Sequence, residues 1–292
     1  MKEIARKESQ KRKSRLAKIF MSPAILIQFF FGWLPIGMAF AVCLFHYHVL
    51  KPEEYVGLAN FQDLFADPLT FQVIKNTFIY TGMSLAIFLL PVIVSILLME
   101  MNKSTIRIMM YLWFFPIAST ASIVIWKWMY NTEYGLLNSI LMSLGLPTLR
   151  WLNDPRLVIF CLILPGILMY GPSLIYLATI QSIPDELYEA AELEGAGFWS
   201  KVWHITLPRM RPVLAMMLLL SIIGSMSVFS QPWILTHGGP NNASMMVVMR
   251  IVNLAIYNMR YGKGTALAII LFAILMVIII IQRKYFKEDI DR

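Results

Sequence analysis

Six long stretches without a charged residue constrain the fold of this chain more than any other feature of its sequence. Each stretch holds 19 to 38 residues between consecutive Asp, Glu, Lys or Arg residues. A helix needs about 20 mostly apolar residues to cross the hydrocarbon core of a bilayer. The stretches cover residues 19–50, 76–99, 108–126, 157–184, 212–249 and 264–282. The sequence therefore predicts an all-α integral membrane protein with six transmembrane helices.

Two uncharged segments need separate interpretation. The longest stretch could hold two helices, but its second half contains Thr236-His-Gly-Gly-Pro-Asn-Asn242, which is typical of a turn. We therefore expect one helix and then a loop. The segment 134–149 is too short to span and is interrupted by polar residues, so we expect a helix that lies on the membrane surface.

The composition excludes several classes of protein. Hydrophobic residues make up 58% of the chain and charged residues 14%, whereas soluble domains carry about 25% charged residues. A soluble fold of this length could not bury so much apolar surface, which argues against a cytosolic enzyme, a secreted domain or a disordered chain. Cys43 and Cys161 both lie in apolar runs, so we expect two buried thiols and no metal site.

The distribution of cations predicts the orientation. If the N-terminus is inside, the inner segments hold 17 Lys and Arg residues and the outer segments hold 8. The positive-inside rule then places both termini in the cytoplasm. The basic run between Lys2 and Lys18 directly precedes a span, so we interpret it as a topological anchor, and we expect no nucleic-acid partner.

The most informative segment is the loop between spans four and five, residues 182–212, which we call the acidic loop. Ser182 is a candidate helix cap, Pro184 suits a first turn, and Asp185 and Glu186 complement the helix dipole. We expect Gly195 and Gly197 to break this helix. A second helix should begin at Phe198, and we expect Pro208 and Pro212 to end it.

The charge of the acidic loop indicates what it binds. Five acids precede its first cation, Lys201: Asp185, Glu186, Glu189, Glu192 and Glu194. A helix that rests on anionic headgroups should instead be rich in Lys and Arg. We therefore interpret the loop as a docking element for a cytosolic protein.

The same loop resembles the EAA loop of ABC-importer membrane subunits. The shared pattern is Glu189-Ala190-Ala191, then Gly195, then Ile205-Thr-Leu-Pro208. Other stretches resemble the carbohydrate-uptake branch, with its maltose-type and glycerol-3-phosphate-type permeases. These stretches are Val56-Gly-Leu-Ala-Asn-Phe61, Asn76-Thr77, Tyr134-Gly-Leu-Leu-Asn138 and Leu235-Thr-His-Gly-Gly-Pro240.

This resemblance implies a type I ABC importer transmembrane fold in the plasma membrane of a prokaryote. The implied divisions are a basic segment at 1–16, a first span with its outer loop at 17–74, a transmembrane core at 75–284 and a tail at 285–292. The implied partners are a second permease subunit, usually a paralogue, a dimer of a cytosolic ABC ATPase, an external solute-binding protein and the lipid bilayer. The implied ATPase-coupling residues are Glu189, Ala190, Ala191, Gly195, Leu207 and Pro208.

The chain is not expected to be an enzyme. It contains no G-x-x-x-x-G-K-[ST] phosphate loop, so we expect ATP and Mg²⁺ to bind the partner ATPase and no cofactor to bind this chain. A proton- or sodium-coupled transporter is the alternative from another class. Such transporters normally place ionisable residues at membrane depth, and the six runs contain no Asp, Glu, Lys or Arg. Nor does the sequence show, at membrane depth, the carboxylate pair, metal-ligand cluster or Ser/His pair that an intramembrane enzyme would need.

The predicted solute is a sugar or an oligosaccharide, with a glycerol-phosphate-like solute as the alternative. Hydroxyl, amide and aromatic groups suit a neutral polar solute, because an unpaired ion at membrane depth is costly. The candidate path residues are Tyr170, Ser173, Ser221, Ser225, Phe229 and Gln231. The serines are equally well interpreted as helix-packing residues. Leu164 and Leu168 are apolar where maltose-type permeases place sugar contacts, so that site does not transfer whole.

Overall fold

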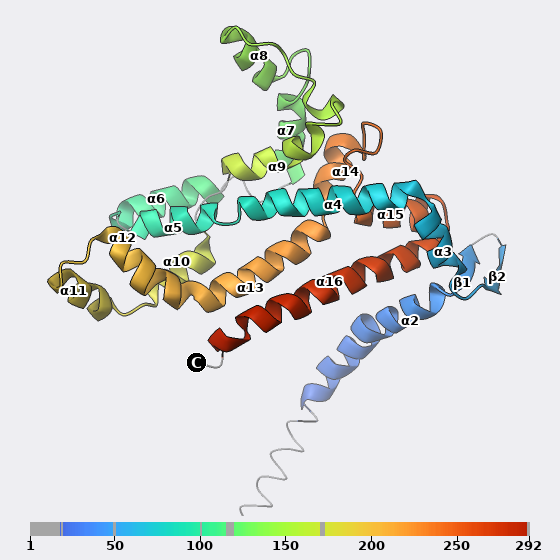
Figure 1. Ribbon diagram of the computed structural model, residues 1–292, viewed down its shortest axis with the longest axis horizontal. Helices are drawn as coiled ribbons and strands as arrows, with labels where there is room; N and C mark the ends of the chain where they lie inside the picture. Colours follow the sequence, from blue (N-terminus) through green and yellow to red (C-terminus); the bar gives the residue numbers. More distant parts are fainter. Residues whose placement is uncertain are drawn as a thin grey trace, which may run out of the picture. The chain divides into compact units, whose positions relative to one another are not determined.

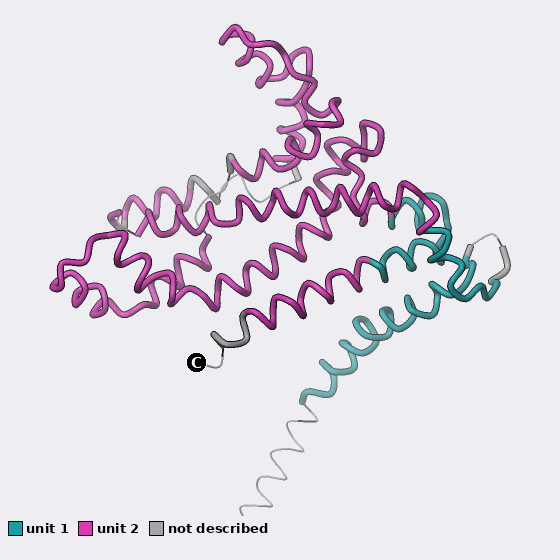
Figure 2. Tube along the Cα trace, viewed as in Figure 1, with its two compact units in different colours: residues 1–64, 251–270 teal, residues 65–250, 271–292 magenta. Residues whose placement is uncertain are grey.

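The computed structural model describes residues 18, 20–48, 51–99, 101–114, 120–169 and 173–290 (Figure 1). The chain divides into two compact units, which have different colours in Figure 2. Unit 1 comprises Met1–Leu64 and Ile251–Ile270, and unit 2 comprises Phe65–Arg250 and Leu271–Arg292.

Four helices of the described residues are long and apolar enough to cross a membrane. They are Phe20–Val42, Pro68–Met99, Phe198–Thr236 and Tyr261–Tyr285, which correspond to the first, second, fifth and sixth predicted spans. The fourth predicted span contains two shorter helices, α9 (Val158–Met169) and α10 (Leu174–Gln181). The third contains α6 (Lys103–Phe114) and α7 (Thr120–Met129). The helical membrane-protein class is thus confirmed, and the count of six spans stays a prediction.

Unit 1 begins with the first long helix, which includes a π-helical segment, η1 (Phe29–Trp33), and α2 (Leu34–Val42). An antiparallel hairpin comes next, formed by β1 (Phe45–His48) and β2 (Lys51–Tyr55), with Phe45 opposite Tyr55. The sequence did not predict this hairpin, because no Asn-Gly or Asp-Gly turn stands between the strands. The unit also contains most of α3 (Ala59–Ala66), a π-helical segment, η4 (Asn253–Tyr257), and the start of α16 (Tyr261–Ile290).

A buried asparagine holds unit 1 together. The Asn60 side chain is fully buried, and its Nδ2 donates to the carbonyl oxygens of Cys43 at 2.8 Å and Phe45 at 2.9 Å. Gly262 also lies against this turn, because a Cβ there would be 2.0 Å from the Phe45 oxygen. Lys263 pairs with Asp63 at 2.7 Å, and its hydrogen bond lowers the pKa of the Asp63 carboxyl.

Unit 2 contains most of the helices. Besides α6, α7, α9 and α10 they are α4 (Pro68–Ala86), α5 (Leu90–Met99), α8 (Leu136–Ser143), η2 (Trp151–Asn153), α11 (Asp185–Leu193), α12 (Phe198–Lys201), η3 (Val202–Thr206), α13 (Leu207–Met226), α14 (Ser230–Thr236) and α15 (Val247–Val252), whose last residues belong to unit 1. α13 packs along α4, which also contacts α9, while α10 packs on α5 and α13. The predicted turn is confirmed, because α14 ends at Thr236 and His237 is left-handed.

Two of the apolar clusters in unit 2 pack its long helices together. One joins α4, α9, α14 and the start of α15 through Tyr80, Leu162, Ile163, Leu235, Met246 and Met249. The other joins α5, α10, η3 and α13 through Val92, Ile96, Tyr176, Ile180, Val202 and Met210. The second cluster lies next to the acidic loop, so it fixes the position of the root of that loop.

A second buried asparagine organises the segment between α7 and α9, residues 130–156, which we call the α8 segment. Asn138 Nδ2 donates to the carbonyl oxygens of Thr132 and Leu149, both at 3.0 Å. Its Oδ1 accepts from the Leu149 amide at 3.1 Å and the Trp151 indole at 2.9 Å. The Tyr130 hydroxyl donates to the Cys161 oxygen at 2.7 Å, and burial raises the pKa of Tyr130.

A third asparagine ties residues 237–246, the α14–α15 loop, to α4. Asn76 Nδ2 donates to the carbonyl oxygens of Asn242 at 2.8 Å and Met245 at 3.1 Å. The Val247 amide donates to Thr77 Oγ1 at 3.0 Å. Arg250 pairs with Asp67 at 2.8 Å, so side chains of α4 and its cap hold both this loop and the start of α15.

Candidate functional site

The acidic helix begins two residues later than the sequence predicted. Ser182 does not cap the acidic helix: it is the C-cap of α10, and its Oγ donates to the Thr179 oxygen at 2.7 Å. Pro184 is the N-cap residue of α11, without a capping side chain. Ser182 lies too close to the end of α10, where its hydroxyl finds a carbonyl oxygen within its own helix. Asp185 and Glu186 occupy the first turn of α11, as predicted.

The predicted break at Gly195 is confirmed. α11 ends at Leu193, and Gly195 has φ +80°, a left-handed conformation that favours glycine. The Ala196 amide donates to the Ala191 oxygen at 2.9 Å, which closes the helix end. Gly197 then serves as the N-cap of α12. The two helical parts of the loop are therefore joined by a short, defined turn.

The second half of the loop differs from the prediction. Pro208 and Pro212 do not end the helix, which runs without interruption from Phe198 through α12, η3 and α13 to Met226. The π-helical η3 directly precedes Pro208, and its wider turn relieves the clash that a proline ring makes in a regular α-helix. Pro208 contributes no N–H to this continuous helix, and the wide hydrogen bond from the Leu207 amide to the Val202 oxygen stands just before it. A movement of α12 is thus carried directly into α13.

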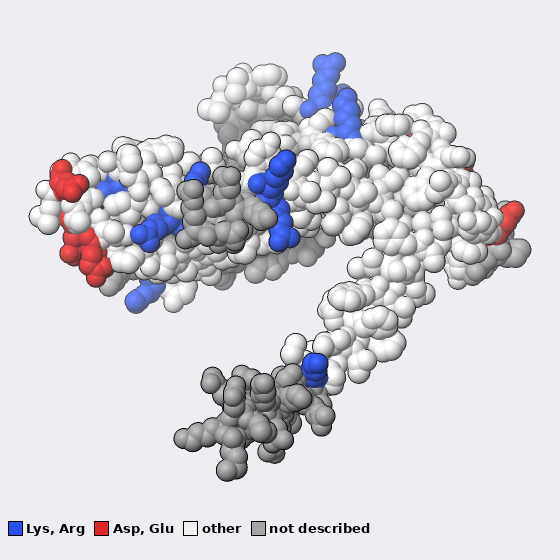
Figure 3. All heavy atoms as spheres, turned by 60° about the horizontal axis from the view of Figure 1, so that its bottom comes forward, with Lys and Arg blue, Asp and Glu red and all other residues white. Residues whose placement is uncertain are grey.

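The surface of the loop is acidic and open. Asp185, Glu186, Glu189 and Glu194 are exposed, and none makes an ion pair within the described part of the chain (Figure 3). Ala190 and Ala191 line a shallow groove of about 420 Å³ between α11 and the following helix. Its other lining residues are Leu187, Glu194, Ala196, Ser200, Lys201, His204 and Ile205. The small alanines leave room there for a side chain of a docked protein.

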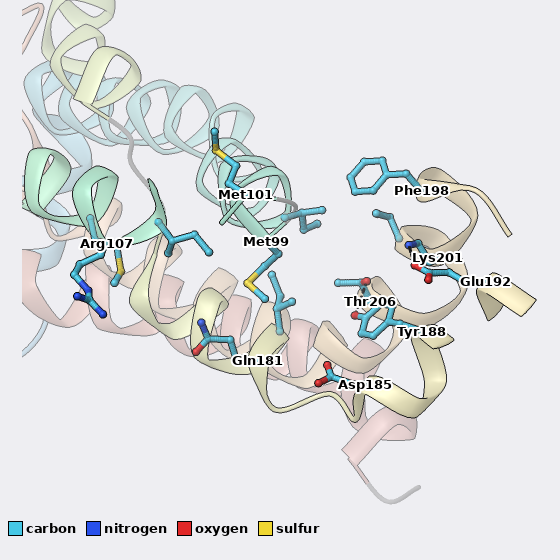
Figure 4. Close-up of a pocket in the computed structure, with 15 residues that line it drawn as sticks. Met99, Met101, Arg107, Gln181, Asp185, Tyr188, Glu192, Phe198, Lys201 and Thr206 are labelled. Carbon is cyan, nitrogen blue, oxygen red and sulfur yellow. Dashed lines mark hydrogen bonds and ion pairs between the residues drawn. The ribbon is translucent and has the colours of Figure 1, made fainter. Parts of the chain in front are cut away.

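A larger cavity of about 710 Å³ lies at the root of the loop (Figure 4). Tyr188, Glu192, Lys201 and Thr206 stand on one wall, and Arg107 of α6 stands on the opposite wall. On the loop side, Lys201 pairs with Glu192 at 2.7 Å and the Tyr188 hydroxyl lies 3.0 Å from Thr206 Oγ1. These two contacts link α11 to the helix after the Gly195 break. The cavity lies between α11 and α6, so these two helices do not pack against each other there.

The structure places the predicted coupling residues in two groups. Glu189, Ala190 and Ala191 lie on α11, and Gly195 forms the break after it. Leu207 and Pro208 lie at the start of α13, with Pro208 exposed and Leu207 packed against the apolar cluster of α5 and α10. The sequence missed Tyr188, Thr206 and the Glu192–Lys201 pair. These partners are 18 and 9 residues apart across a turn, so helical spacing could not reveal them.

The predicted path residues do not form one cluster. Ser221 is half-buried on α13 and Ser225 is buried one turn later, with its Oγ donating to the Ile222 oxygen at 3.0 Å. The Ser173 amide donates to Ser95 Oγ at 3.2 Å, which joins α10 to α5. Among the described residues, no hydrogen bond or ring contact joins Ser173 to Ser221 or Ser225. Tyr170, together with the predicted bend at Gly171-Pro172, lies outside the described residues.

Phe229 is the N-cap residue of α14, and Gln231 lies within that helix. Both residues follow a break in the predicted fifth span. α13 ends at Met226 and α14 begins at Ser230, so the polar stretch around Ser227 interrupts the helix. The Phe229 ring stacks on Trp233, with centroids 5.4 Å apart. Gln231 accepts from the Tyr80 hydroxyl at 3.4 Å and donates to the Leu162 oxygen. Gln231 therefore joins α14 to α4 and α9, which is a structural role.

The chain is thus a helical membrane protein whose acidic loop continues, after the break at Gly195, into one of its long apolar helices. Residues 71–287 match the family model of the binding-protein-dependent transport system inner membrane component. This chain belongs to that family. It is a multi-pass protein of the inner membrane and the non-catalytic permease subunit of a binding-protein-dependent ABC transporter.

Relatives and solved structures agree with this family. The chain is 30% identical to the probable ABC transporter permease protein YurN of Bacillus subtilis, over 92% of this chain and 95% of that protein. It is also 30% identical to the trehalose/maltose transport system permease protein MalF of Thermococcus litoralis, over 95% and 96%. A chain of the bacterial alginate ABC transporter, crystallised with a periplasmic protein bound to an alginate pentasaccharide, has the same fold. It has a TM-score of 0.82, 24% identity and 96% coverage of both chains.

Proposed function

We propose that this permease forms half of a pore that imports a sugar or an oligosaccharide, driven by ATP hydrolysis on a separate ATPase. The names of its relatives support this substrate class: trehalose/maltose in Thermococcus litoralis, arabinooligosaccharides in Bacillus subtilis and diacetylchitobiose in Streptomyces coelicolor. Its partners in this proposal are a paralogous permease, a dimer of ABC ATPase subunits and an external solute-binding protein. ATP and Mg²⁺ bind the ATPase subunits.

The proposed topology has six spans and cytoplasmic termini. The distribution of Lys and Arg favours this orientation, and it puts the acidic loop on the same side as the ATPase. The α8 segment and the α14–α15 loop are then outside. The proposed core is 75–284, preceded by the basic segment 1–16 and the first span with its outer loop, 17–74, and followed by the tail 285–292.

The single observation that carries the proposed mechanism is the shape of the acidic loop. α11 is hinged at Gly195 to a helix that continues uninterrupted into α13. We assign α11, with Glu189, Ala190 and Ala191, to ATPase docking, and Leu207 with Pro208 to the junction with the spanning helix. Closure of the ATPase would then move α12 and α13 together and bias the pore between two states.

Charge reversal of Glu189 tests the docking assignment. Glu189→Lys should abolish uptake, because it replaces an attraction by a repulsion of about 2–5 kcal/mol in a desolvated contact with a basic residue. Glu186→Lys, on the same exposed helix, is the matched control. ATPase co-purification and sugar uptake are measured in the intact complex. Normal uptake by a correctly inserted Glu189→Lys complex would refute the docking role.

A bulky residue in α13 tests the solute path, which we propose to include Tyr170, Ser173, Ser221, Ser225, Phe229 and Gln231. Ser225→Trp should block uptake by filling the path, whereas Ser225→Ala should preserve it. Because Ser225 is buried within this chain, assembly of both complexes is checked by size-exclusion chromatography. Full uptake through an assembled Ser225→Trp complex would remove Ser225 from the path.

A further inference from the structure

The exposed face of α8 is apolar, although α8 lies outside every predicted span. Leu136, Ile140 and Leu144 stand at intervals of four residues, and they are 42%, 45% and 67% exposed. Met142 and Leu146 add to this surface with 54% and 51% exposure. The opposite face carries the buried Asn138. The hydrogen-bonding face of α8 is thus turned inward, and its aliphatic face is turned outward.

The polar groups on the outward face are already satisfied within the helix. Ser139 Oγ donates to the Gly135 oxygen at 3.1 Å, and Ser143 Oγ donates to the Ile140 oxygen at 2.7 Å. The helix end is closed as well, because the Leu146 amide donates to the Leu141 oxygen at 2.9 Å around the left-handed Gly145. In an apolar medium an unsatisfied polar group costs several kcal/mol. This face therefore needs no water to satisfy its hydroxyl groups.

α7, which belongs to the third predicted span and precedes α8, also exposes apolar side chains. Val124, Ile125 and Trp128 of α7 are 55%, 57% and 52% exposed. Tyr134, 64% exposed, stands between this surface and α8. Exposed Trp and Tyr residues are typical of the level where a membrane meets water. The position of Trp128 and Tyr134 indicates that α8 begins at that level.

The absence of charge distinguishes a lipid partner from a protein partner. No charged residue occurs between Tyr134 and Leu149. A reversible protein interface normally has a polar rim and is often anchored by Arg, neither of which is offered by this face. Lipid tails need only apolar area and satisfied hydrogen bonds.

We propose that α8 is an interfacial anchor whose Leu136, Ile140 and Leu144 face inserts into the outer leaflet of the bilayer. The inference rests on the proposed topology, which puts the α8 segment outside. Through Asn138 and the Tyr130–Cys161 hydrogen bond, the anchored α8 holds the ends of α7 and α9 at the depth of the headgroups. The pore helices can then move against a segment that is held at the membrane surface.

Spin labels in the complete transporter test this proposal in nanodiscs. Both native cysteines are replaced by alanine, and the labels are placed at Ile140→Cys or, as a matched control in the same segment, at the exposed Thr148→Cys. We expect the label at position 140 to be relaxed by oxygen, which partitions into lipid, and to be protected from an aqueous nickel chelate. The label at position 148 should show the reverse preference.

Three results would overturn the anchor. Equal nickel accessibility at positions 140 and 148 would place α8 in water. Protection of position 140 that appears only after the solute-binding protein is added would make this face a protein-docking surface. In sealed right-side-out vesicles, a Thr148→Cys thiol that an impermeant maleimide cannot reach would refute the proposed topology along with the anchor. The first two results leave that topology intact when the maleimide reacts, so the two failures are distinguishable.

Discussion

The acidic loop precedes most of α13 and the α14–α15 loop follows α14, but the two loops are held by different kinds of contact. The α14–α15 loop is tied to α4 by hydrogen bonds from the buried Asn76 and, just beyond the loop, by the Val247 amide, which donates to Thr77, and by the Arg250–Asp67 pair. In the acidic loop, the Tyr188–Thr206 contact and the Glu192–Lys201 ion pair join parts of the loop to each other, while Val202 and Met210 pack against α5 and α10 at its root. The first arrangement resists displacement. The second holds α11 to the helix after the Gly195 break, and a cavity of about 710 Å³ lies between α11 and α6.

The kind of contact that holds the α14–α15 loop recurs elsewhere in the described chain. Buried side-chain amides that bond main-chain oxygens hold three elements: Asn60 holds the hairpin of unit 1, Asn76 holds the α14–α15 loop, and Asn138 holds the α8 segment. The acidic loop has no such amide among the described residues. We therefore expect substitutions of the asparagines to reduce stability, and substitutions in the acidic loop to reduce coupling.

The largest effect on stability is expected from Asn138→Ala. The change leaves two carbonyl oxygens, the Leu149 amide and the Trp151 indole without their partner, and each unsatisfied buried group costs about 1–3 kcal/mol. The α8 segment should become sensitive to protease and the melting temperature of the purified complex should fall. Ser139→Ala, which removes one exposed hydroxyl, is the control. Equal melting temperatures for both variants would contradict the role of Asn138 as a hub.

The next effect is expected at the hinge, on activity more than on stability. Gly195→Val forces a β-branched residue into a left-handed conformation, at a cost of about 1–2 kcal/mol. No atom of the described residues lies within 4 Å of the added Cβ, so the strain is in the backbone and not in crowding within this part of the chain. Uptake should fall while the complex still assembles. Gly195→Asn should recover part of the uptake, because Asn tolerates this conformation.

A conservative change beside the hinge sharpens that result. Gly197 has φ −73° and equally open space around it, so Gly197→Ala should leave uptake unchanged. If Gly197→Ala and Gly195→Val impair uptake equally, the conformation of Gly195 is not what matters.

A smaller loss is expected from Asn76→Ala. It removes the donor to the Asn242 and Met245 oxygens but leaves the Thr77 and Arg250 links in place. We expect about 1–3 kcal/mol of destabilisation and faster proteolysis within the α14–α15 loop. Gln72→Ala removes an exposed bond to the Asn241 oxygen and should have a weaker effect. A stronger effect of Gln72→Ala than of Asn76→Ala would reverse our ranking of buried over exposed links.

The smallest effect is expected from Glu192→Gln. The Glu192 side chain is 60% exposed, and exposed ion pairs contribute about 0–1 kcal/mol that salt screens further. The melting temperature should change little in low salt and not at all in high salt. Glu194→Gln, which breaks no ion pair among the described residues, is the control. A large, salt-independent loss at Glu192 would show that the pair holds the loop more firmly than its exposure suggests.

The sequence predicted the features that depend on apolar length and on special backbone conformations. Charge-free runs located the long helices, and Gly195 located the break, because only a glycine suits a turn of that conformation without strain. The α8 helix and the turn after Thr236 were also predicted. Ser182 and Pro208 were misinterpreted for a common reason. A serine can lie at the end of one helix or at the start of the next, and a proline can end a helix or lie within one. The sequence does not show that α10 extends to Ser182 or that a π-turn accommodates Pro208.

The candidate site was predictable only in part. The acidic helix and its small residues could be read directly, whereas Tyr188–Thr206 and Glu192–Lys201 depend on how the chain folds back at Gly195. The asparagine hubs stand in the motifs that resemble carbohydrate permeases, but the carbonyl oxygens they bind lie as far as 169 residues away. Such partners are determined by tertiary packing and have no local signature.

The π-turn at Val202–Thr206 also determines how the residues after it are rotated about the helix axis relative to the residues before it. A helix advances about 100° per residue, since it has 3.6 residues per turn. A π-turn accommodates one residue more than a regular helical turn, so η3 fixes the direction in which α13 points Ser221 and Ser225 relative to the groove between α11 and α12. Deleting that extra residue would let the backbone return to a regular helix with Ser221 and Ser225 near their present direction, whereas deleting one residue from a regular turn of α13 before Ser221 would rotate both serines by about 100°. Within the helix from Phe198 to Met226, the π-turn is thus the segment that can lose one residue without a change in the direction of the serines.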